Sequence, residues 1–208
     1  GGASLVYSTY LGGAVDDFLL TIGLDSLSQA TVGGYTYSNS YPTVNAYDAT
    51  FTGYYKAIVT QLNPTGDTVR FSTYLGGSGD EVISGLAISE NGYVFVTGNT
   101  TSMDFPTEEA FDPLLDGGSD AFLTCFSPDG GALAYSTYYG GTGYDFGYGL
   151  AVDQNRNVFW SGYTNSIDID PIGALQDTIA GAYDLFFARV DWQEYICIDS
   201  DNDGFGDP

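Results

Sequence analysis

The stretch Tyr7-Ser8-Thr9-Tyr10-Leu11-Gly12-Gly13 decides the fold, because the chain contains it three times. It returns as FSTYLGG at residues 71–77 and as YSTYYGG at residues 135–141. The spacing is 64 residues both times, from position 7 to 71 and from 71 to 135. A fixed period of this length indicates a repeat architecture, in which one small structural unit is stacked on the next.

The residues between these anchors keep the same register. Pro42-Thr43 falls on Pro106-Thr107, and Gly85-Leu86-Ala87-Ile88 falls on residues 149–152, which read GLAV. Agreement at so many positions is beyond chance. The sequence therefore predicts three copies of one unit rather than a single motif used three times.

Each unit has the pattern of a four-stranded antiparallel meander. In residues 78–141, four segments rich in β-branched or aromatic residues are separated by turn residues such as Glu90-Asn91-Gly92. The expected strands are Gly85–Ser89, Tyr93–Thr97, Ala121–Ser127 and Ala132–Tyr139. No useful window has apolar residues at helical spacing, and residues 108–115 are the one place where a short helical turn is expected.

The predicted fold class is all-β, with three four-stranded antiparallel propeller-blade-like repeats of 64 residues and an extra N-terminal strand. We expect five divisions of the chain. They are residues 3–13, a strand that completes a blade; 14–77, repeat 1; 78–141, repeat 2; 142–191, repeat 3 without its last strand; and 192–208, an acidic tail with the pattern of a calcium loop.

The order of the motifs resembles the bacterial β-propeller repeat family called SBBP. The motifs are YSTYLGG, GGSGDE, GLAIS-ENG-YVFVTGNT, DFPT, GGSDAFL and SPDG, and the resemblance covers nearly all of residues 3–191. The third unit departs from the pattern at residues 168–171, which replace the DFPT of residues 104–107. The family occurs in secreted and cell-surface proteins and has no agreed enzymatic role. The resemblance therefore implies an extracellular or cell-surface location more than an activity.

The two ends of the repeat array do not match. The chain starts with Ser4–Gly13, the last strand of a unit whose other strands are absent, and repeat 3 has no such strand after Tyr183–Val190. Either the chain is a piece of a longer protein with more units, or residues 4–13 of one molecule complete the open edge of repeat 3 in another. The second alternative is head-to-tail self-association through an exposed sheet edge.

The charge excludes some partners. The net charge is −23, with 27 acidic residues against four Lys and Arg. No basic run is present to displace counterions from phosphates, so nucleic acid is not an expected partner. No apolar stretch approaches the roughly 20 residues that span a bilayer, so no membrane insertion is expected. Strong self-repulsion favours the binding of divalent cations.

The C-terminal tail has the pattern of a calcium site. Residues 199–207 read DSDNDGFGD and place oxygen ligands at alternate positions, with a glycine at the sharp turn. The segment resembles a thrombospondin type 3 repeat. The expected ligands are Asp199, Asp201, Asp203, Phe205 through its carbonyl, and Asp207, with calcium as the cofactor. The alternative is a solvated linker, and the role of the nearby Cys197 is left open.

Acidic residues also follow each glycine doublet. These are Asp16-Asp17, Asp80-Glu81 and, in the pair Tyr144-Asp145, the aspartate, at equivalent places in the three units. Such side chains bind calcium or cap a turn by accepting hydrogen bonds from backbone N–H groups. Turn capping is the favoured interpretation.

The sequence contains few of the residue types that catalysis commonly uses. The chain has no histidine, which removes Ser-His-Asp and Cys-His nucleophiles and the common zinc sites. The expectation is a non-catalytic extracellular structural or adhesive surface protein that self-assembles head to tail into a filament by strand complementation. The alternative is a carbohydrate-binding or glycoside-cleaving propeller, which would show a carboxylate pair facing one cleft with an aromatic platform.

Overall fold

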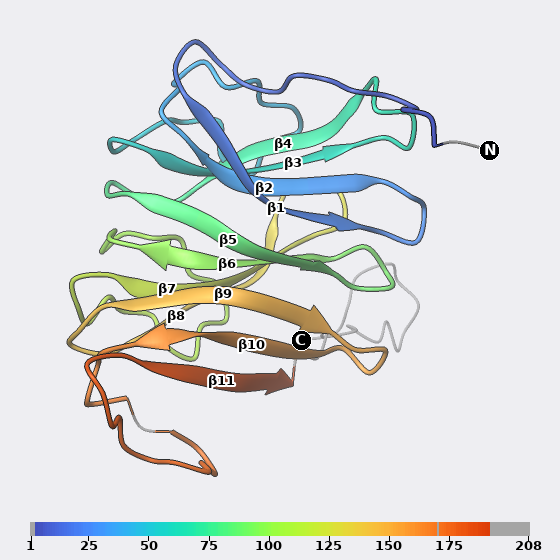
Figure 1. The fold of residues 1–208 in the computed structure, drawn as a ribbon. Coiled ribbons are helices and arrows are strands. Elements are labelled where there is room, and N and C mark those ends of the chain that lie inside the picture. Colours follow the sequence, from blue (N-terminus) through green and yellow to red (C-terminus); the bar gives the residue numbers. More distant parts are fainter. Residues whose placement is uncertain (1–2, 170, 192–208) are drawn as a thin grey trace, which may run out of the picture.

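The chain folds into three antiparallel sheets (Figure 1). The computed structural model describes residues 3–169 and 171–191. Sheet 1 contains β1 (Asp17–Leu24), β2 (Ala30–Thr36), β3 (Lys56–Leu62) and β4 (Val69–Leu75). Sheet 2 contains β5 (Glu81–Ile88), β6 (Val94–Thr100), β7 (Asp120–Phe126) and β8 (Leu133–Tyr139). Sheet 3 contains β9 (Asp145–Val152), β10 (Asn157–Thr164) and β11 (Asp184–Asp191).

Each sheet is a meander in which consecutive strands are neighbours. The ladders repeat with the sequence: Val59 is opposite Thr73 in sheet 1, and Leu123 is opposite Thr137 in sheet 2. The all-β prediction is confirmed, and the four strands expected within residues 78–141 are β5 to β8, with ends shifted by a few residues. No helix occurs in residues 3–169 and 171–191, so that part of the chain has none that could span a membrane.

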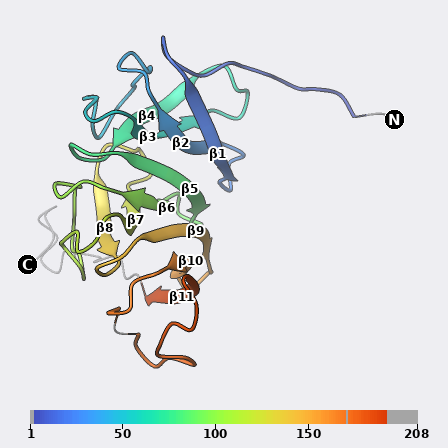
Figure 2. The same cartoon turned by 60° about the vertical axis from the view of Figure 1, so that its left-hand side comes forward.

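The sheets are stacked face to face (Figures 1 and 2), which is consistent with a propeller-like fold. Strand β5 packs across β1, β2 and β3, and β9 packs in the same way across β5, β6 and β7. The first strand of each sheet therefore contacts the face of the sheet before it. This repeated contact positions every surface that is discussed below.

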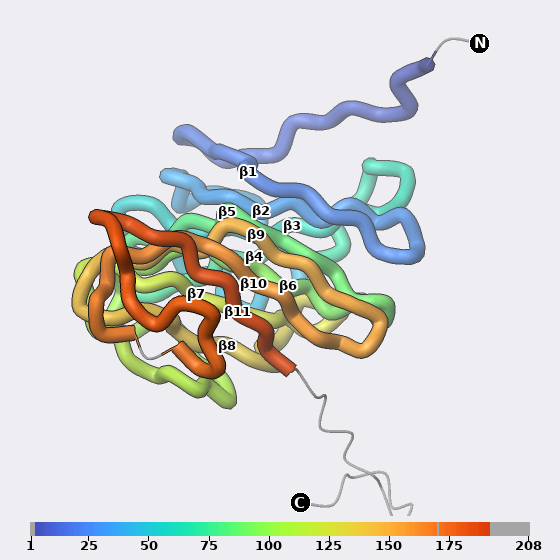
Figure 3. Tube along the Cα trace, turned by 60° about the horizontal axis from the view of Figure 1, so that its bottom comes forward, coloured from blue at the N-terminus to red at the C-terminus, as the bar shows by residue number. Residues whose placement is uncertain are grey.

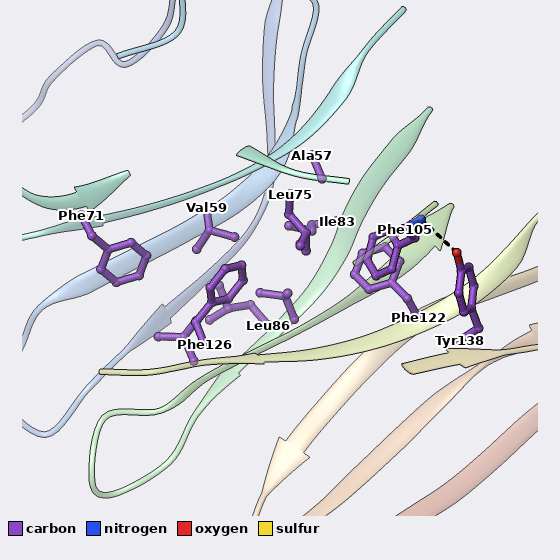
Figure 4. Close-up of a cluster of buried hydrophobic side chains, with 12 residues drawn as sticks. Ala57, Val59, Phe71, Leu75, Ile83, Leu86, Phe105, Phe122, Phe126 and Tyr138 are labelled. Carbon is purple, nitrogen blue, oxygen red and sulfur yellow. Dashed lines mark hydrogen bonds between the residues drawn. The ribbon is translucent and has the colours of Figure 1, made fainter. Parts of the chain in front are cut away.

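Two apolar clusters hold the stack together. The first lies between sheets 1 and 2 (Figure 4) and the second between sheets 2 and 3. The first contains Ala57, Val59, Phe71 and Leu75 from sheet 1 and Ile83, Leu86, Val94, Val96, Phe105, Phe122, Phe126 and Tyr138 from the sheet 2 unit. The second contains Phe95, Ala121, Leu123, Cys125, Val158, Trp160 and Phe186.

Sheet 2 is covered on both faces, and its sequence reflects this. Every residue of β7 is buried, and successive side chains of the strand point into the two different clusters. A strand that is buried on both faces needs a continuous apolar run instead of alternation, as the segment AFLTCF shows. The close approach of the sheets also needs glycine: a Cβ at Gly33 would lie 2.8 Å from Cγ2 of Ile83.

The tyrosine at the fourth position of each buried YSTY-like motif ties the last strand to the loop between the second and third strands. The hydroxyl of Tyr138 donates to the carbonyl of Ser102 at 2.7 Å and accepts from the N–H of Phe105 at 3.0 Å. Tyr74 makes the same pair of contacts with Ser38 and Tyr41. The motif is therefore structural in sheets 1 and 2.

Residues 3–13 differ from the sequence-based expectation of a strand. They have no assigned strand and are largely exposed, and the segment runs away from the sheets (Figures 2 and 3). The physical reason is that no strand in the described part of the chain lies beside this segment to pair with its backbone N–H and C=O groups. Whether the segment completes a blade stays a prediction.

Replacement of Tyr138 by Phe tests the role of the tyrosine. Tyr138→Phe leaves the buried carbonyl of Ser102 and the N–H of Phe105 without their partner, which is expected to cost ~1–3 kcal/mol of unfolding free energy. Urea denaturation measures the change. The matched variant Tyr10→Phe, at an exposed position, is expected to leave the stability of the monomer unchanged; an equal loss in both variants would contradict this assignment.

Candidate functional site

Within residues 3–169 and 171–191, no sheet covers the outer face of sheet 1. Leu19, Ile22 and Leu24 on β1 are exposed there, and we call these three residues the head face. One repeat later their counterparts are Ile83, Leu86 and Ile88, which pack against sheet 1. The head face therefore has the residue pattern of a buried face, without its cover.

The outer face of sheet 3 has the complementary character. Leu185 and Phe187 are exposed on β11, and Phe159 on β10 stacks against Phe187 with ring centroids 6.3 Å apart. We call these three residues the tail face. Their counterparts in sheet 2 are Phe95, Ala121 and Leu123, all of which lie in the buried cluster that sheet 3 covers.

Sheet 3 also has an open edge. It has three strands in the order β11-β10-β9, so β11 lies at its edge. Residues 3–13 carry the sequence of the strand that borders β3 and β7 in the other two sheets. Tyr10 is 104% exposed, whereas the equivalent Tyr74 and Tyr138 are 1% and 0% exposed. The same motif is thus buried twice and exposed once.

The acidic residues after the glycine doublets cap turns, which confirms the favoured interpretation at two of the three positions. Asp17 accepts from the N–H of Gly13 at 2.8 Å, and Asp145 accepts from the N–H of Gly141 at 3.1 Å. In the second unit, the carboxylate of Asp80 accepts from the N–H groups of Tyr54 and Tyr55, which links the two units.

Three carboxylates are completely buried at the junctions between sheets. They are Glu81, Asp120 and Asp145. Burial, together with the nearby Asp145 and Asp112, raises the pKa of Asp120 to about 7. Burial also raises the pKa of Asp145 and of Glu81, against hydrogen bonds that lower it. Asp120 was not singled out in the sequence analysis, because it is separated from Asp145 by a whole loop and strand.

Loop aspartates also hold the segment that follows each of the second and third glycine doublets. The carboxylate of Asp104 accepts from the N–H and the hydroxyl of Ser78 at 2.8 and 2.9 Å. Asp168 accepts from the N–H of Thr142 at 3.0 Å in the same way. The departure of the third unit from DFPT at residues 168–171 therefore keeps the aspartate contact.

The expected calcium ligands of the tail lie outside the described residues. Asp199, Asp201, Asp203, Phe205 and Asp207, like Cys197, belong to residues 192–208, so the calcium site there stays a prediction. Within residues 3–169 and 171–191, no three His, Cys, Asp or Glu side chains form a ready-made metal group.

Two features bear on the carbohydrate alternative. A cleft of about 290 Å³ is lined by polar residues and contains no aromatic side chain: Ser89, Glu90, Asn91, Asp153, Gln154 and Arg156. An aromatic cluster lies elsewhere, on sheet 1 and the loop before β3, and consists of Phe18, Tyr35, Tyr37, Tyr54 and Tyr55. The cleft and the aromatic platform are therefore not the same place.

Comparison with known families identifies the repeat. Residues 70–106 and 134–170 each match SBBP, a β-propeller repeat family. Both matches begin on the last strand of one sheet and continue through the first two strands of the next, so the family's unit bridges a junction between sheets. No match to the chain was found among curated proteins. The likeness of the tail to a thrombospondin type 3 repeat stays a prediction.

The buried carboxylates predict an unusual dependence of stability on pH in the absence of divalent cations. The folded-state pKa of Asp120, about 7, lies above its ordinary value of 3.8, so the folded state binds more protons between these values. The contribution of Asp120 to the free energy of unfolding is fully present below pH ~4 and is lost as the pH rises through ~7. We expect a lower unfolding free energy at pH 8 than at pH 5, measured by urea denaturation with chelator.

Asp120→Asn is the control for this effect. The aspartates with lowered pKa values, such as Asp104 and Asp168, titrate below this window and do not contribute to it. Removal of the Asp120 carboxyl is therefore expected to make the decrease between pH 5 and pH 8 smaller, with Asp145 and Glu81 contributing the remainder. An unchanged pH profile in the variant would contradict the assignment to Asp120.

Proposed function

We propose that the chain is a non-catalytic structural or adhesive protein of the cell surface that assembles head to tail into a filament. Residues 3–13 of one copy would add to the edge of β11 in a second copy. The head face of the first copy would then cover the tail face of the second. The cell-surface location follows from the family resemblance and is part of the proposal. Calcium in the C-terminal tail would stiffen the assembled protein.

The observation that carries the proposal is the exposure of Tyr10. This side chain belongs to a motif whose other two copies are buried and donate a hydrogen bond to the loop carbonyls of Ser38 and Ser102. The equivalent carbonyl in the third unit belongs to Ser166. Strand addition would bury Tyr10 against Ser166 of the neighbouring copy and would satisfy the backbone of both segments.

The packing of the apolar faces supports the same arrangement. The junction between sheets 1 and 2 already shows how one face covers the other, with Ile83 and Leu86 packed against Val59. The head face supplies the counterparts of Ile83 and Leu86, and Phe187 of the tail face is the counterpart of Val59 two repeats later. A second copy of this chain is therefore the occupant whose shape and chemistry are already built into the repeat.

The register of the added strand follows from the ladders within the chain. Val59 is opposite Thr73, and Leu123 is opposite Thr137. The same offset places Thr9 of one copy opposite Phe187 of the next. Gln61 and Cys125 are opposite Phe71 and Tyr135 in the same ladders, which places Tyr7 opposite Arg189.

Light scattering on the purified chain at increasing protein concentration tests the assembly. We expect particles that grow with concentration, because the contact is heterologous and does not close on itself. Tyr10→Phe is expected to weaken association by roughly 1–3 kcal/mol, or about 5- to 150-fold, and removal of residues 3–13 to leave monomers. A parent chain that stays monomeric at all concentrations would refute self-assembly and would indicate that the faces are covered by further units of a longer protein.

Disulfide cross-linking tests the register. In a Cys197→Ser background, the pair Thr9→Cys and Phe187→Cys is expected to give a ladder of covalent oligomers under mild oxidation. The control pair, Ser8→Cys and Phe187→Cys, places the two thiols on opposite faces of the sheet, since successive side chains alternate. Equal cross-linking of both pairs would contradict the register.

The aromatic cluster on sheet 1 favours carbohydrate binding as a second candidate function. Phe18 and Tyr35 stack at 4.9 Å, and Tyr54, which is 74% exposed, packs against Tyr37. Exposed aromatic faces pack well against sugar rings. Affinity electrophoresis in gels that contain neutral polysaccharides would detect retardation, and Tyr54→Ala would abolish it; migration that no polysaccharide changes would exclude this candidate.

A further inference from the structure

We propose that the junction between sheets 2 and 3 binds a divalent cation between the carboxylates of Asp120 and Asp145. The ion would occupy the place where the junction between sheets 1 and 2 has the ammonium group of Lys56. The inference concerns the described part of the chain and is independent of the tail and of head-to-tail assembly.

The first junction shows how a buried positive charge is held at this position. Lys56 is the first residue of β3 and is 2% exposed. Its Nζ lies 3.0 Å from Oδ2 of Asp48, 3.2 Å from the carbonyl of Thr50 and 2.8 Å from the hydroxyl of Thr52. Burial raises the pKa of Glu81 in the next sheet, and the positive charge of Lys56 is one of the influences that oppose this rise. A buried cation thus pairs with Asp48 and is close enough to Glu81 of the next unit to favour its charged form.

The second junction has the same positions, but an aspartate stands where the first junction has its lysine. One repeat later, Lys56 becomes Asp120 and Glu81 becomes Asp145, while Asp48 becomes Asp112. Thr52 becomes Asp116, so every charged side chain at the place is acidic. Asp120 and Asp145 are both completely buried. Burial of negative charges without a positive partner is strongly unfavourable, so the junction requires a neutralising species.

The two carboxylates are oriented so that each offers an oxygen. Oδ2 of Asp120 accepts from the N–H of Asp116 at 3.1 Å, and Oδ2 of Asp145 accepts from the N–H of Gly141 and the hydroxyl of Ser166. Oδ1 of Asp120 and Oδ1 of Asp145 are buried and have no hydrogen-bond partner. Each side chain is therefore fixed through one oxygen and presents the other.

Gly140 leaves room for the carboxylates of Asp120 and Asp145 to approach the same point. The point that a Cβ at this glycine would occupy is 2.8 Å from Oδ1 of Asp120 and 2.7 Å from Oδ2 of Asp145. Because a glycine has no side chain there, the carboxylates from β7 and β9 converge on the same small region. Two buried carboxylates from adjacent sheets thus meet within reach of a single ion.

The donor set selects the class of ion. All the groups named at the junction offer oxygen, with two negative charges buried and no nitrogen or sulfur ligand among them. Oxygen ligands and this charge suit a hard divalent cation, and calcium accepts variable geometry and completes its shell with carbonyl oxygens and water. The competing possibility is one proton shared between the two carboxyl groups.

Calcium titration of the full chain distinguishes the ion from the proton. The tail is silenced by replacing Asp199, Asp201, Asp203 and Asp207 with Asn, so that the response comes from the folded sheets. In this background we expect calorimetric binding of one calcium ion per chain at pH 7.5 and a higher midpoint of thermal unfolding with calcium than with chelator. Absence of binding and of a thermal shift at millimolar calcium would overturn the proposal in favour of the shared proton.

The decisive variant is Asp120→Lys, which restores the residue of the first junction. Its ammonium is expected to replace the ion, so the variant folds, loses calcium binding and is at least as stable in chelator as the parent. Asp184→Lys is the matched control, because it makes the same charge change at the equivalent position of the uncovered sheet 3, and it is expected to keep calcium binding. Retention of binding in Asp120→Lys would overturn the assignment.

A more conservative variant separates a loss of calcium binding from a loss of the fold. Asp145→Asn keeps the size and the hydrogen-bonding shape of the side chain but removes one charge. It is expected to weaken calcium binding at least tenfold while the circular dichroism spectrum stays that of the parent. An unchanged calcium affinity in this folded variant would overturn the proposal.

Discussion

The structure depends on the burial of one sheet face by the next sheet. A four-stranded meander has two apolar faces and cannot cover either by itself, so its stability comes from its neighbours. Sheet 2 is the only one of the three described sheets with a neighbour on both sides, and Phe95 and Phe122 of its strands β6 and β7 are completely buried on opposite faces. Sheets 1 and 3 each keep one face uncovered, which is where the proposed activity of the molecule lies.

Electrostatics adds a second constraint at the same junctions. The first strands of sheets 2 and 3 each begin with a completely buried acidic residue, Glu81 or Asp145, next to the third strand of the preceding sheet. At the first junction the positive charge of Lys56 lies near the buried Glu81. At the second junction the equivalent residue is Asp120, a second buried carboxyl next to Asp145. The apolar packing is thus common to both junctions, whereas the neutralisation of charge differs between them. With a net charge of −23, the chain has few lysines and arginines of its own to supply.

Much of this architecture is predictable from the 64-residue period. The β class, the meander and the turn-capping aspartates follow from local patterns that recur in each unit. The burial of individual apolar residues does not, because Ile22 and Leu86 occupy the same position in the repeat and only a neighbouring sheet makes one exposed and the other buried. The pairing of Asp120 with Asp145 was missed because the two belong to different units. The exchange of Lys56 for Asp120 in the aligned repeats was the signal that could have revealed it.

In the proposed assembly, a second copy of the chain covers the edge and the outer face of sheet 3. Amide hydrogen exchange at low and high protein concentration measures this cover directly, because an added strand protects the backbone N–H groups on both sides of the new ladder. The account predicts that residues 5–11 and 184–191 become protected together as the concentration rises, while residues 120–126 are protected throughout. Rapid exchange of residues 5–11 and 184–191 at every concentration would contradict it.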